Sequence, residues 1–169
     1  MRTTSTAPNT TIAFIGGGNM ASAIIGGLIH QGLDASRIEI VEPWAEARTR
    51  LQTQFGITAH EAPSAALARC ALVVWAVKPQ TFRDAAAQAR AHTQHALHLS
   101  VAAGIRSDSI AQWLGSERIV RAMPNTPALV GKGMTGLFAR AAVSAQERDQ
   151  VDAVVATTGA HVWLGEESH

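Results

Sequence analysis

The stretch from Ile12 to Gly32, IAFIGGGNMASAIIGGLIHQG, constrains the fold more than any other part of the chain. An apolar run leads directly into Gly16 and Gly18, and Ala21 completes a G-x-G-x-x-A spacing where a helix-like stretch begins. Gly16 permits a tight turn, Gly18 lets the backbone approach a pyrophosphate, and Ala21 allows close packing of helix on strand. The stretch therefore predicts a strand, turn and helix that bind phosphate at the helix N-terminus.

Apolar runs bounded by turn residues recur along the rest of the chain, and helix-like stretches separate most of them. The runs lie at 12–15, 38–41, 72–77, 97–101 and 119–123, with shorter ones at 135–139 and 162–164. They are continuous rather than alternating, as in LVVWAV, which is typical of strands covered on both faces. We expect an α/β fold: a Rossmann-type, doubly wound, mostly parallel sheet.

Two helices carry recognisable capping residues. Ser107 is a candidate N-cap for a helix that ends before Gly115. Ser144, with Glu147 three residues later, predicts a capping box for a helix that runs towards Gly159. These residues are signals of the fold, and we assign them no chemistry.

Composition narrows the class of protein. With 169 residues, 47% of them hydrophobic and 16% charged, the chain is expected to form one globular domain over 12–164 behind a flexible tail at 1–11. A net charge of +1 without a basic stripe argues against nucleic-acid binding. No apolar segment predicts a membrane span or a signal core. The single cysteine, Cys70, is expected to be a packing residue in a reducing compartment, which favours the cytoplasm.

Glu42 ends the second apolar run, in IEIVEP. A carboxylate at the end of the second strand can accept hydrogen bonds from the adenosine ribose and would repel the extra phosphate of NADP. The alternative is an exposed acid at a strand end that has no ligand.

Three further stretches lie where predicted strands end: WAVKPQ at 75–80, SVAAGI at 100–105 and RAMPNTPALVGKG at 121–133. Together with IGGGNMASA they resemble the pyrroline-5-carboxylate reductase family over residues 12–164. The resemblance implies reduction of a small-molecule substrate, the cyclic imine 1-pyrroline-5-carboxylate, to proline with NADH or NADPH as the cofactor.

The resemblance also implies a set of cofactor contacts. They are Ile15, Gly16, Gly17, Gly18, Asn19, Met20 and Ala21 at the phosphate turn, then Glu42, then Ala76, Val77, Lys78 and Pro79, then Val101, Ala102 and Ala103, and finally Asn125. Lys78, Asn125 and Thr126 are possible contacts of the nicotinamide or the substrate. The alternatives are a solvated charge for Lys78 and a turn-forming role for Asn125.

No dedicated catalytic acid or base and no metal are expected. A protonated imine is already electrophilic, so positioning and electrostatics can suffice for hydride transfer. His92, His95 and His98 are spaced by three residues, which does not keep three ligands on one helical face. We interpret them as structural or surface histidines.

Two departures from the family pattern bear on the cofactor. Glu42 is followed by Pro43 and Trp44, where NADP-using relatives carry groups that accept a phosphate, so we predict a preference for NADH. The loop AHEAPSAAL offers Pro63 and Ser64 where relatives often have an asparagine near the ribose, which leaves that contact open.

The last stretch, HVWLGEESH, resembles the hinge of the family. Residues 165–169 are then expected to begin a linker to a helical domain that builds the homo-oligomer and holds the substrate carboxylate. On this reading the chain binds a dinucleotide and reduces the imine poorly or not at all. The alternatives are a stand-alone dinucleotide-binding sensor module and a related enzyme of the β-hydroxyacid dehydrogenase or imine reductase type.

Overall fold

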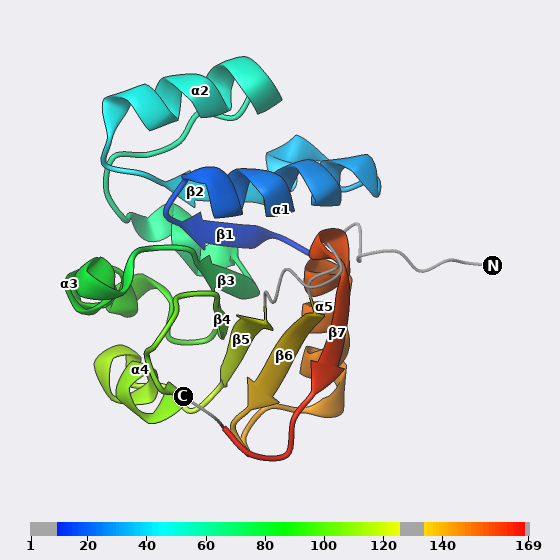
Figure 1. The fold of residues 1–169 in the computed structure, drawn as a ribbon. Helices are drawn as coiled ribbons and strands as arrows, with labels where there is room; N and C mark the ends of the chain where they lie inside the picture. Colours follow the sequence, from blue (N-terminus) through cyan, green and yellow to red (C-terminus); the bar gives the residue numbers. More distant parts are fainter. Residues whose placement is uncertain (1–9, 126–133, 168–169) are drawn as a thin grey trace.

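One seven-stranded sheet organises the described part of the chain, residues 10–125 and 134–167 of a computed structural model (Figure 1). The strands are β1 (Ile12–Ile15), β2 (Ile38–Val41), β3 (Leu72–Trp75), β4 (Leu97–Ser100), β5 (Ile119–Asn125), β6 (Met134–Ala139) and β7 (Ala160–Trp163). Their order is β2-β1-β3-β4-β5-β6-β7. Strands β1 to β5 pair in parallel, β6 is antiparallel to β5, and β7 is parallel to β6. The expected mostly parallel sheet is confirmed.

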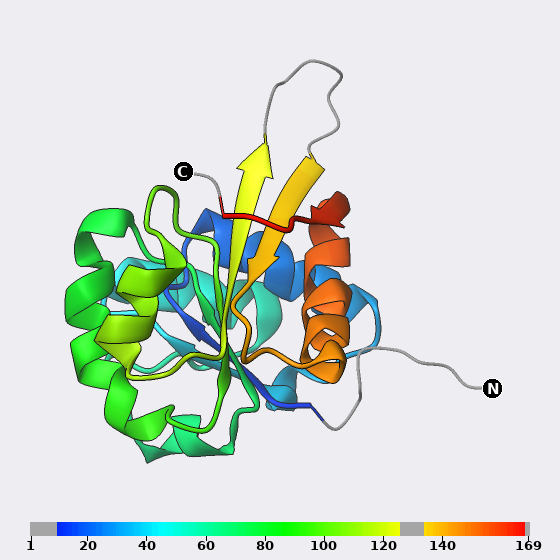
Figure 2. The ribbon, with the colours of Figure 1, turned by 90° about the horizontal axis from the view of Figure 1, so that it is seen from below.

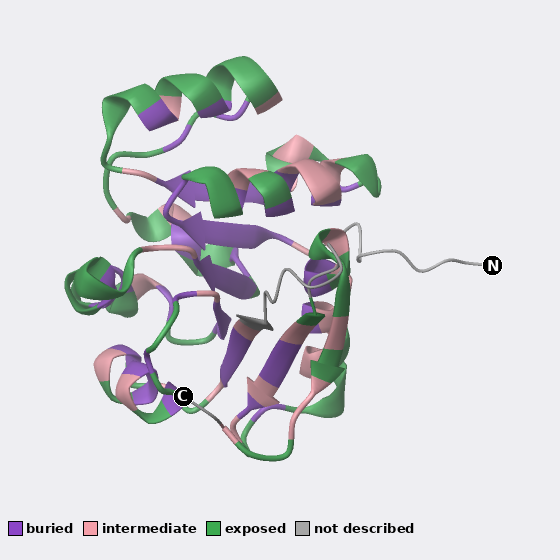
Figure 3. Cartoon of the chain, in the orientation of Figure 1, coloured by how far each residue is buried: buried purple, intermediate pink, exposed green. Residues whose placement is uncertain are grey.

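Helices cover both faces of this sheet. They are α1 (Asn19–His30), α2 (Ala45–Phe55), α3 (Pro79–Ala89), α4 (Ser107–Leu114) and α5 (Ala145–Val155). Side chains of α1, α2 and α5 share one buried cluster with the sheet, and side chains of α3, α4 and the short 3-10 helix η2 (Ala65–Arg69) share the other. Figure 3 shows the central strands buried between helices whose outer faces are exposed. No helix in the described ranges is long and apolar enough to cross a membrane.

Strand ends differ from the apolar runs because backbone bonding, and not hydropathy alone, sets them. β3 ends at Trp75, two residues before the run does, and the N–H of Ala76 still donates to the carbonyl of Ile15 at 2.8 Å. The chain then turns into α3, where Lys78 is the N-cap and Pro79 the first helical residue, a position that suits proline. Apolar residues after Trp75 therefore line the edge of the sheet.

The capping box at Ser144 and Glu147 is present as predicted, with both reciprocal hydrogen bonds. The prediction for Ser107 was wrong by one residue, because Arg106 is the N-cap of α4 and Ser107 is its first residue. The carboxylate of Glu167 accepts hydrogen bonds from the backbone N–H and the hydroxyl of Ser107 at 2.5 and 2.8 Å. A side chain 60 residues away thus takes the role expected of a local serine.

Candidate cofactor site

The glycine turn after β1 contains two glycines with different constraints. Gly16 has φ of +101°, its N–H donates to the carbonyl of Val41 at 2.8 Å, and a Cβ there would lie 2.4 Å from the carbonyl oxygen of Ala76. A Cβ on Gly18 would meet nothing within 4 Å. Gly16 is therefore required by the fold, whereas Gly18 faces open space.

The first turn of α1 has free hydrogen-bond donors. Gly18 is its N-cap, no side chain caps the helix, and no acidic residue lies in its first turn. Within the described residues, nothing accepts from the N–H groups of Asn19, Met20 and Ala21. These groups lie at the positive end of the helix next to the open space at Gly18, so an anionic group fits there.

Glu42 connects the glycine turn to the end of β2. Its Oε1 accepts from the N–H of Gly17 and its Oε2 accepts from the N–H of Trp44, both at 2.8 Å. The carboxylate is therefore fixed in place. A carboxylate has about four acceptor sites, so each oxygen retains capacity for a further donor such as a ribose hydroxyl.

A pocket of about 580 Å³ runs along the carboxyl ends of β1, β2 and β3. Among the expected contacts it brings together Ile15, Gly16, Gly18, Asn19, Glu42, Ala76, Val77 and Lys78. Expected contacts outside its lining are Gly17, Met20 and Pro79, which are chain neighbours of lining residues, Ala21, which lies two residues after Asn19, and Val101, Ala102 and Ala103, which follow β4. Asn125 ends β5, and Thr126 lies outside the described residues.

Lys78 lies at the rim of this pocket. Its carbonyl accepts from the N–H and the hydroxyl of Thr81 at 2.9 and 3.0 Å, so its backbone is fixed at the start of α3. The side chain is exposed and lines the pocket. The described residues include no ion-pair partner for it, so its ammonium is free to meet an anionic group.

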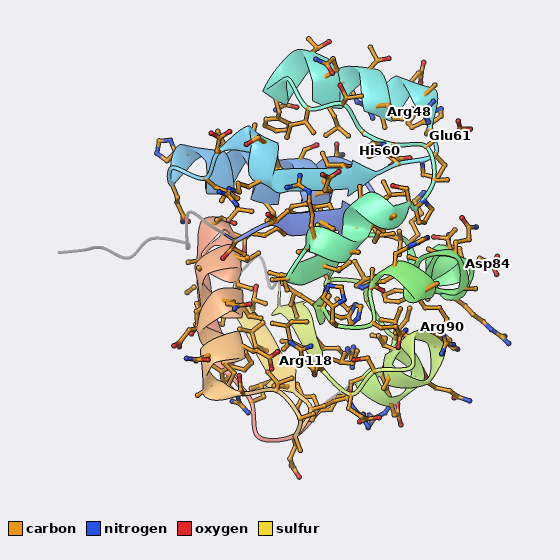
Figure 4. The ribbon with its side chains drawn as sticks, turned by 180° about the vertical axis from the view of Figure 1, so that it is seen from behind. Arg48, His60, Glu61, Asp84, Arg90 and Arg118 are labelled. Atoms are coloured by element: carbon orange, nitrogen blue, oxygen red, sulfur yellow. The ribbon has the colours of Figure 1, made fainter. Side chains whose placement is uncertain are left out.

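Most of the outer wall of the pocket was not predicted from the sequence, in which Pro43, Trp44 and Pro63 were noted only as departures from the family pattern. This wall comprises Pro43, Trp44, Ala47 and Arg50 from the β2–α2 segment, Glu61 and Pro63 from the segment after α2, and Thr81, Asp84, Ala85 and Gln88 from α3. Figure 4 labels Glu61 and Asp84 towards the same edge of the molecule. A tryptophan two residues after a strand-end acid was the signal that could have identified this wall.

The three spaced histidines lie apart. His98 is buried in β4 and its Nδ1 accepts from the indole N–H of Trp75 at 3.0 Å, whereas Nε2 of His95 lies 2.5 Å from the carbonyl oxygen of Ala68. Burial lowers the pKa of His98 to about 4, so this ring is neutral at physiological pH. In the ranges that the structure describes, no three His, Cys, Asp or Glu residues converge on a possible metal position.

A buried ionic cluster lies beside the sheet, away from the pocket. Residues after β7 pass across β6 and β5 towards α4 (Figure 2), and Glu167 accepts there from the guanidinium of Arg121 at 2.7 Å. The side chains of Arg121 and Glu167 are only 2% and 6% exposed. Burial by itself would raise the pKa of Glu167. Hydrogen bonds from Arg121 and Ser107 lower it by more, so this pKa lies below its usual value.

The sequence and the fold are similar to those of known reductases. Residues 11–104 match the model of a family described as NADP oxidoreductase, coenzyme F420-dependent. The chain is 43% identical over 159 residues to pyrroline-5-carboxylate reductase of Pseudomonas aeruginosa, covering 93% of this chain and 58% of the relative. The solved pyrroline-5-carboxylate reductase of Coxiella burnetii superposes with a TM-score of 0.84 at 32% identity, over 94% of this chain and 60% of that one.

The fold is also similar to that of a structure whose sequence is more distant. The pyrroline carboxylate reductase of Plasmodium falciparum, solved with NADP bound, superposes with a TM-score of 0.73 at 23% identity over 94% of this chain and 59% of that one. The chain thus spans about three-fifths of the length of the relatives that it matches.

Proposed function

The chain belongs to the family described as NADP oxidoreductase, coenzyme F420-dependent, and we propose that it is the cofactor-binding part of a pyrroline-5-carboxylate reductase. In this reaction a hydride passes from the nicotinamide to the imine carbon of 1-pyrroline-5-carboxylate, and the product is proline. One observation carries the proposal: the pocket at the glycine turn occurs in a chain 43% identical to such a reductase over 93% of its length.

The proposed cofactor position follows the carboxyl ends of the strands. The pyrophosphate lies against the free N–H groups of Asn19 and Met20, and the adenosine ribose lies beside Glu42. The nicotinamide end extends along 76–79 towards 101–103. The proposed contacts are Ile15, Gly16, Gly17, Gly18, Asn19, Met20, Ala21, Glu42, Ala76, Val77, Lys78, Pro79, Val101, Ala102, Ala103 and Asn125.

The chemistry proposed for the chain is positioning. A protonated imine already accepts a hydride, so we assign no side chain as a catalytic acid. The exposed ammonium of Lys78 lines the pocket and can attract a cofactor hydroxyl or the substrate carboxylate. Roles for Asn125 and Thr126 at the nicotinamide rest on the family resemblance alone.

NADH is the proposed preferred cofactor. The bonds from Gly17 and Trp44 fix the Glu42 carboxylate beside the pocket, where the ribose of a bound cofactor would lie. The 2′-phosphate of NADPH would bring a second negative group to this carboxylate, at a cost in binding free energy.

The remaining two-fifths of the relatives' length is proposed to supply what this chain lacks. We propose that this part is a helical domain that forms the dimer and holds the substrate carboxylate. We therefore expect the 169-residue chain to bind NADH, and to reduce the imine slowly or not at all.

A fusion tests the proposal. Residues 1–167 are joined to the remaining part of the Pseudomonas aeruginosa relative, and NADH oxidation is followed with and without 1-pyrroline-5-carboxylate. We expect oxidation only with the imine. The purified 169-residue chain should bind NADH in calorimetry without catalysing this turnover.

Other outcomes would point elsewhere. If the fusion binds NADH and folds but leaves the imine untouched, the reductase assignment is wrong and a sensor module is favoured. If it instead oxidises a 3-hydroxy acid with NAD, a related dehydrogenase is favoured. If neither protein binds a dinucleotide, the cofactor assignment itself fails.

A further inference from the structure

Trp44 is unusual among the four tryptophans of the chain because it is 56% exposed. It belongs to neither buried cluster, whereas Trp75 is fully buried and Trp113 and Trp163 pack against the clusters. Exposing an indole leaves a large apolar area in water, and covering that area with a ligand is favourable. The ring also lines the pocket, so a ligand in the pocket can cover it.

The backbone that carries this ring is fixed. The N–H of Trp44 donates to Glu42, and its carbonyl accepts from the N–H of Arg48 at 3.1 Å. The guanidinium of Arg48, labelled in Figure 4, donates to the carbonyls of Glu42 and Pro43 at 3.0 and 2.6 Å. With the backbone fixed in this way, only the side-chain torsions of Trp44 remain to be ordered by a ligand, which lowers the cost in conformational entropy.

Arg50 adds a second planar group to the same wall. Its Cζ lies 5.4 Å from the centroid of the Trp44 ring, within the range of a cation–π contact. None of the acidic groups in the described ranges forms an ion pair with this arginine. Its guanidinium therefore keeps a planar face next to the indole, and planar guanidinium groups and aromatic rings both stack on nucleobases.

The position of this pair in the pocket decides which part of a ligand it meets. Gly18, Glu42, Trp44 and Arg50 all line the pocket. Glu42 lies between the glycine turn and Trp44 because it accepts from the N–H of Gly17 and from that of Trp44. Trp44 and Arg50 follow β2, which is the edge strand of the sheet beside β1. In sheets of this type the dinucleotide crosses the carboxyl ends of the strands with its pyrophosphate at the glycine turn. The next group after the adenosine ribose is the adenine base.

We propose that Trp44 and Arg50 form the stacking wall for the adenine base of the cofactor. This inference rests on the proposed function, because it names residues of the same site. It assigns affinity for the adenylate half to an indole and a guanidinium that are held by the β2–α2 segment. Neither residue takes part in hydride transfer, so both act on binding alone.

Calorimetric titrations of the chain with NADH and with ADP-ribose test the proposal. We expect Trp44→Ala to weaken both ligands by roughly 10-fold, within the range of base–aromatic stacking, and Trp44→Phe to retain most of the affinity. Arg50→Ala should weaken both ligands by a smaller factor. Quenching of tryptophan fluorescence by ADP-ribose should be strong in the parent chain and largely lost in Trp44→Phe.

Arg148→Ala is the matched control, since Arg148 lies over Trp163 at 4.9 Å and neither residue lines the pocket. Arg148→Ala should bind both ligands as the parent does, and thermal melting checks that each variant folds.

Parent-like binding by Trp44→Ala overturns the proposal. A loss of affinity for NADH that is not matched by a loss of affinity for ADP-ribose overturns it as well. A titration of Arg50→Ala with NADPH completes the set: if this variant weakens NADPH but neither NADH nor ADP-ribose, Arg50 contacts a phosphate and the stacking role is wrong. Failure of the parent chain to bind either ligand would instead refute the proposed function.

Discussion

At the scale of single residues, the carboxylate of Glu42 has two roles. It accepts from backbone N–H groups of the glycine turn and of the segment before α2, and it lies beside the proposed ribose position. A change at Glu42 therefore alters the shape of the pocket for every dinucleotide. Its charge acts mainly on the ligand that carries an extra phosphate.

We predict that Glu42→Gln shifts the ratio of NADH to NADPH affinity towards NADPH by about tenfold, because the substitution removes the negative charge. It also replaces one of the two acceptor oxygens by an amide donor that faces a backbone N–H, a loss that acts on both cofactors alike. Calorimetry with both cofactors measures the ratio, which cancels losses common to both. Glu61→Gln is the control, since Glu61 also lines the pocket but makes no hydrogen bond to the glycine turn. Equal affinities of the parent chain for the two cofactors would contradict the preference for NADH.

At the scale of elements, the turn from β1 into α1 separates residues that the fold needs from residues that the ligand needs. Gly16 combines a positive φ with close contact to the carbonyl of Ala76, while Gly18 has an extended backbone and open space around its missing Cβ. Glycine therefore occurs at these two positions of one motif for two different physical reasons.

Substituting alanine for each glycine in turn should separate the effect on stability from the effect on cofactor binding. Gly16→Ala is expected to lower the free energy of unfolding by about 2 kcal/mol or more, from backbone strain and overlap with Ala76. Gly18→Ala should leave that free energy within about 0.5 kcal/mol of the parent, while NADH affinity falls about tenfold. Denaturant unfolding and calorimetry measure the two effects. Normal NADH binding by Gly18→Ala would show that this backbone does not approach the cofactor.

Helix ends show which elements a sequence can predict. The Ser144–Glu147 box was predictable because both partners lie within one helical turn. The cap of α4 was not, because Glu167 reaches Ser107 only after β7 has joined the sheet and the chain has crossed β5 and β6. Local spacing is visible in a sequence, whereas this contact depends on the complete topology.

At the scale of the whole molecule, the parallel pairing of β1 to β5 followed from buried runs separated by helices, whereas the order of the strands was not predicted. The antiparallel turn from β5 into β6 did not follow, because an apolar run does not record its direction. The resemblance to pyrroline-5-carboxylate reductases is confirmed by the relatives. Most of the outer wall of the pocket could not be predicted, since Trp44 and Pro63 line one pocket only after separate segments of the chain have folded together.

The cluster around Glu167 joins distant parts of the molecule, so its loss should reduce global stability. We predict that Glu167→Ala lowers the free energy of unfolding by about 3 kcal/mol at neutral pH, because the substitution breaks the buried ion pair between Arg121 and Glu167. Glu166→Ala is the matched control, since Glu166 is exposed, and should change it by less than about 0.5 kcal/mol. Denaturant unfolding measures both, and equal effects would contradict the role of the cluster.

The same carboxylate gives an acid dependence with a definite sign. The pKa of Glu167 is lower in the folded chain than the usual 4.5, so its contribution is complete above that value and is lost as the pH falls through the folded pKa. The difference in unfolding free energy between the parent chain and Glu167→Ala should therefore shrink below about pH 4.5.

The distance in sequence between Ser107 and Glu167 has a consequence for synthesis. When α4 and β5 leave the ribosome, the carboxylate that neutralises Arg121 and completes the first turn of α4 has not yet been made. Until Glu167 has been made, this half of the sheet lacks the ion pair between Arg121 and Glu167 and the bonds at the first turn of α4, which is a reason for the nascent chain to remain open there. Synthesis of Glu167 thus completes the contacts of Ser107, which was synthesised 60 residues earlier.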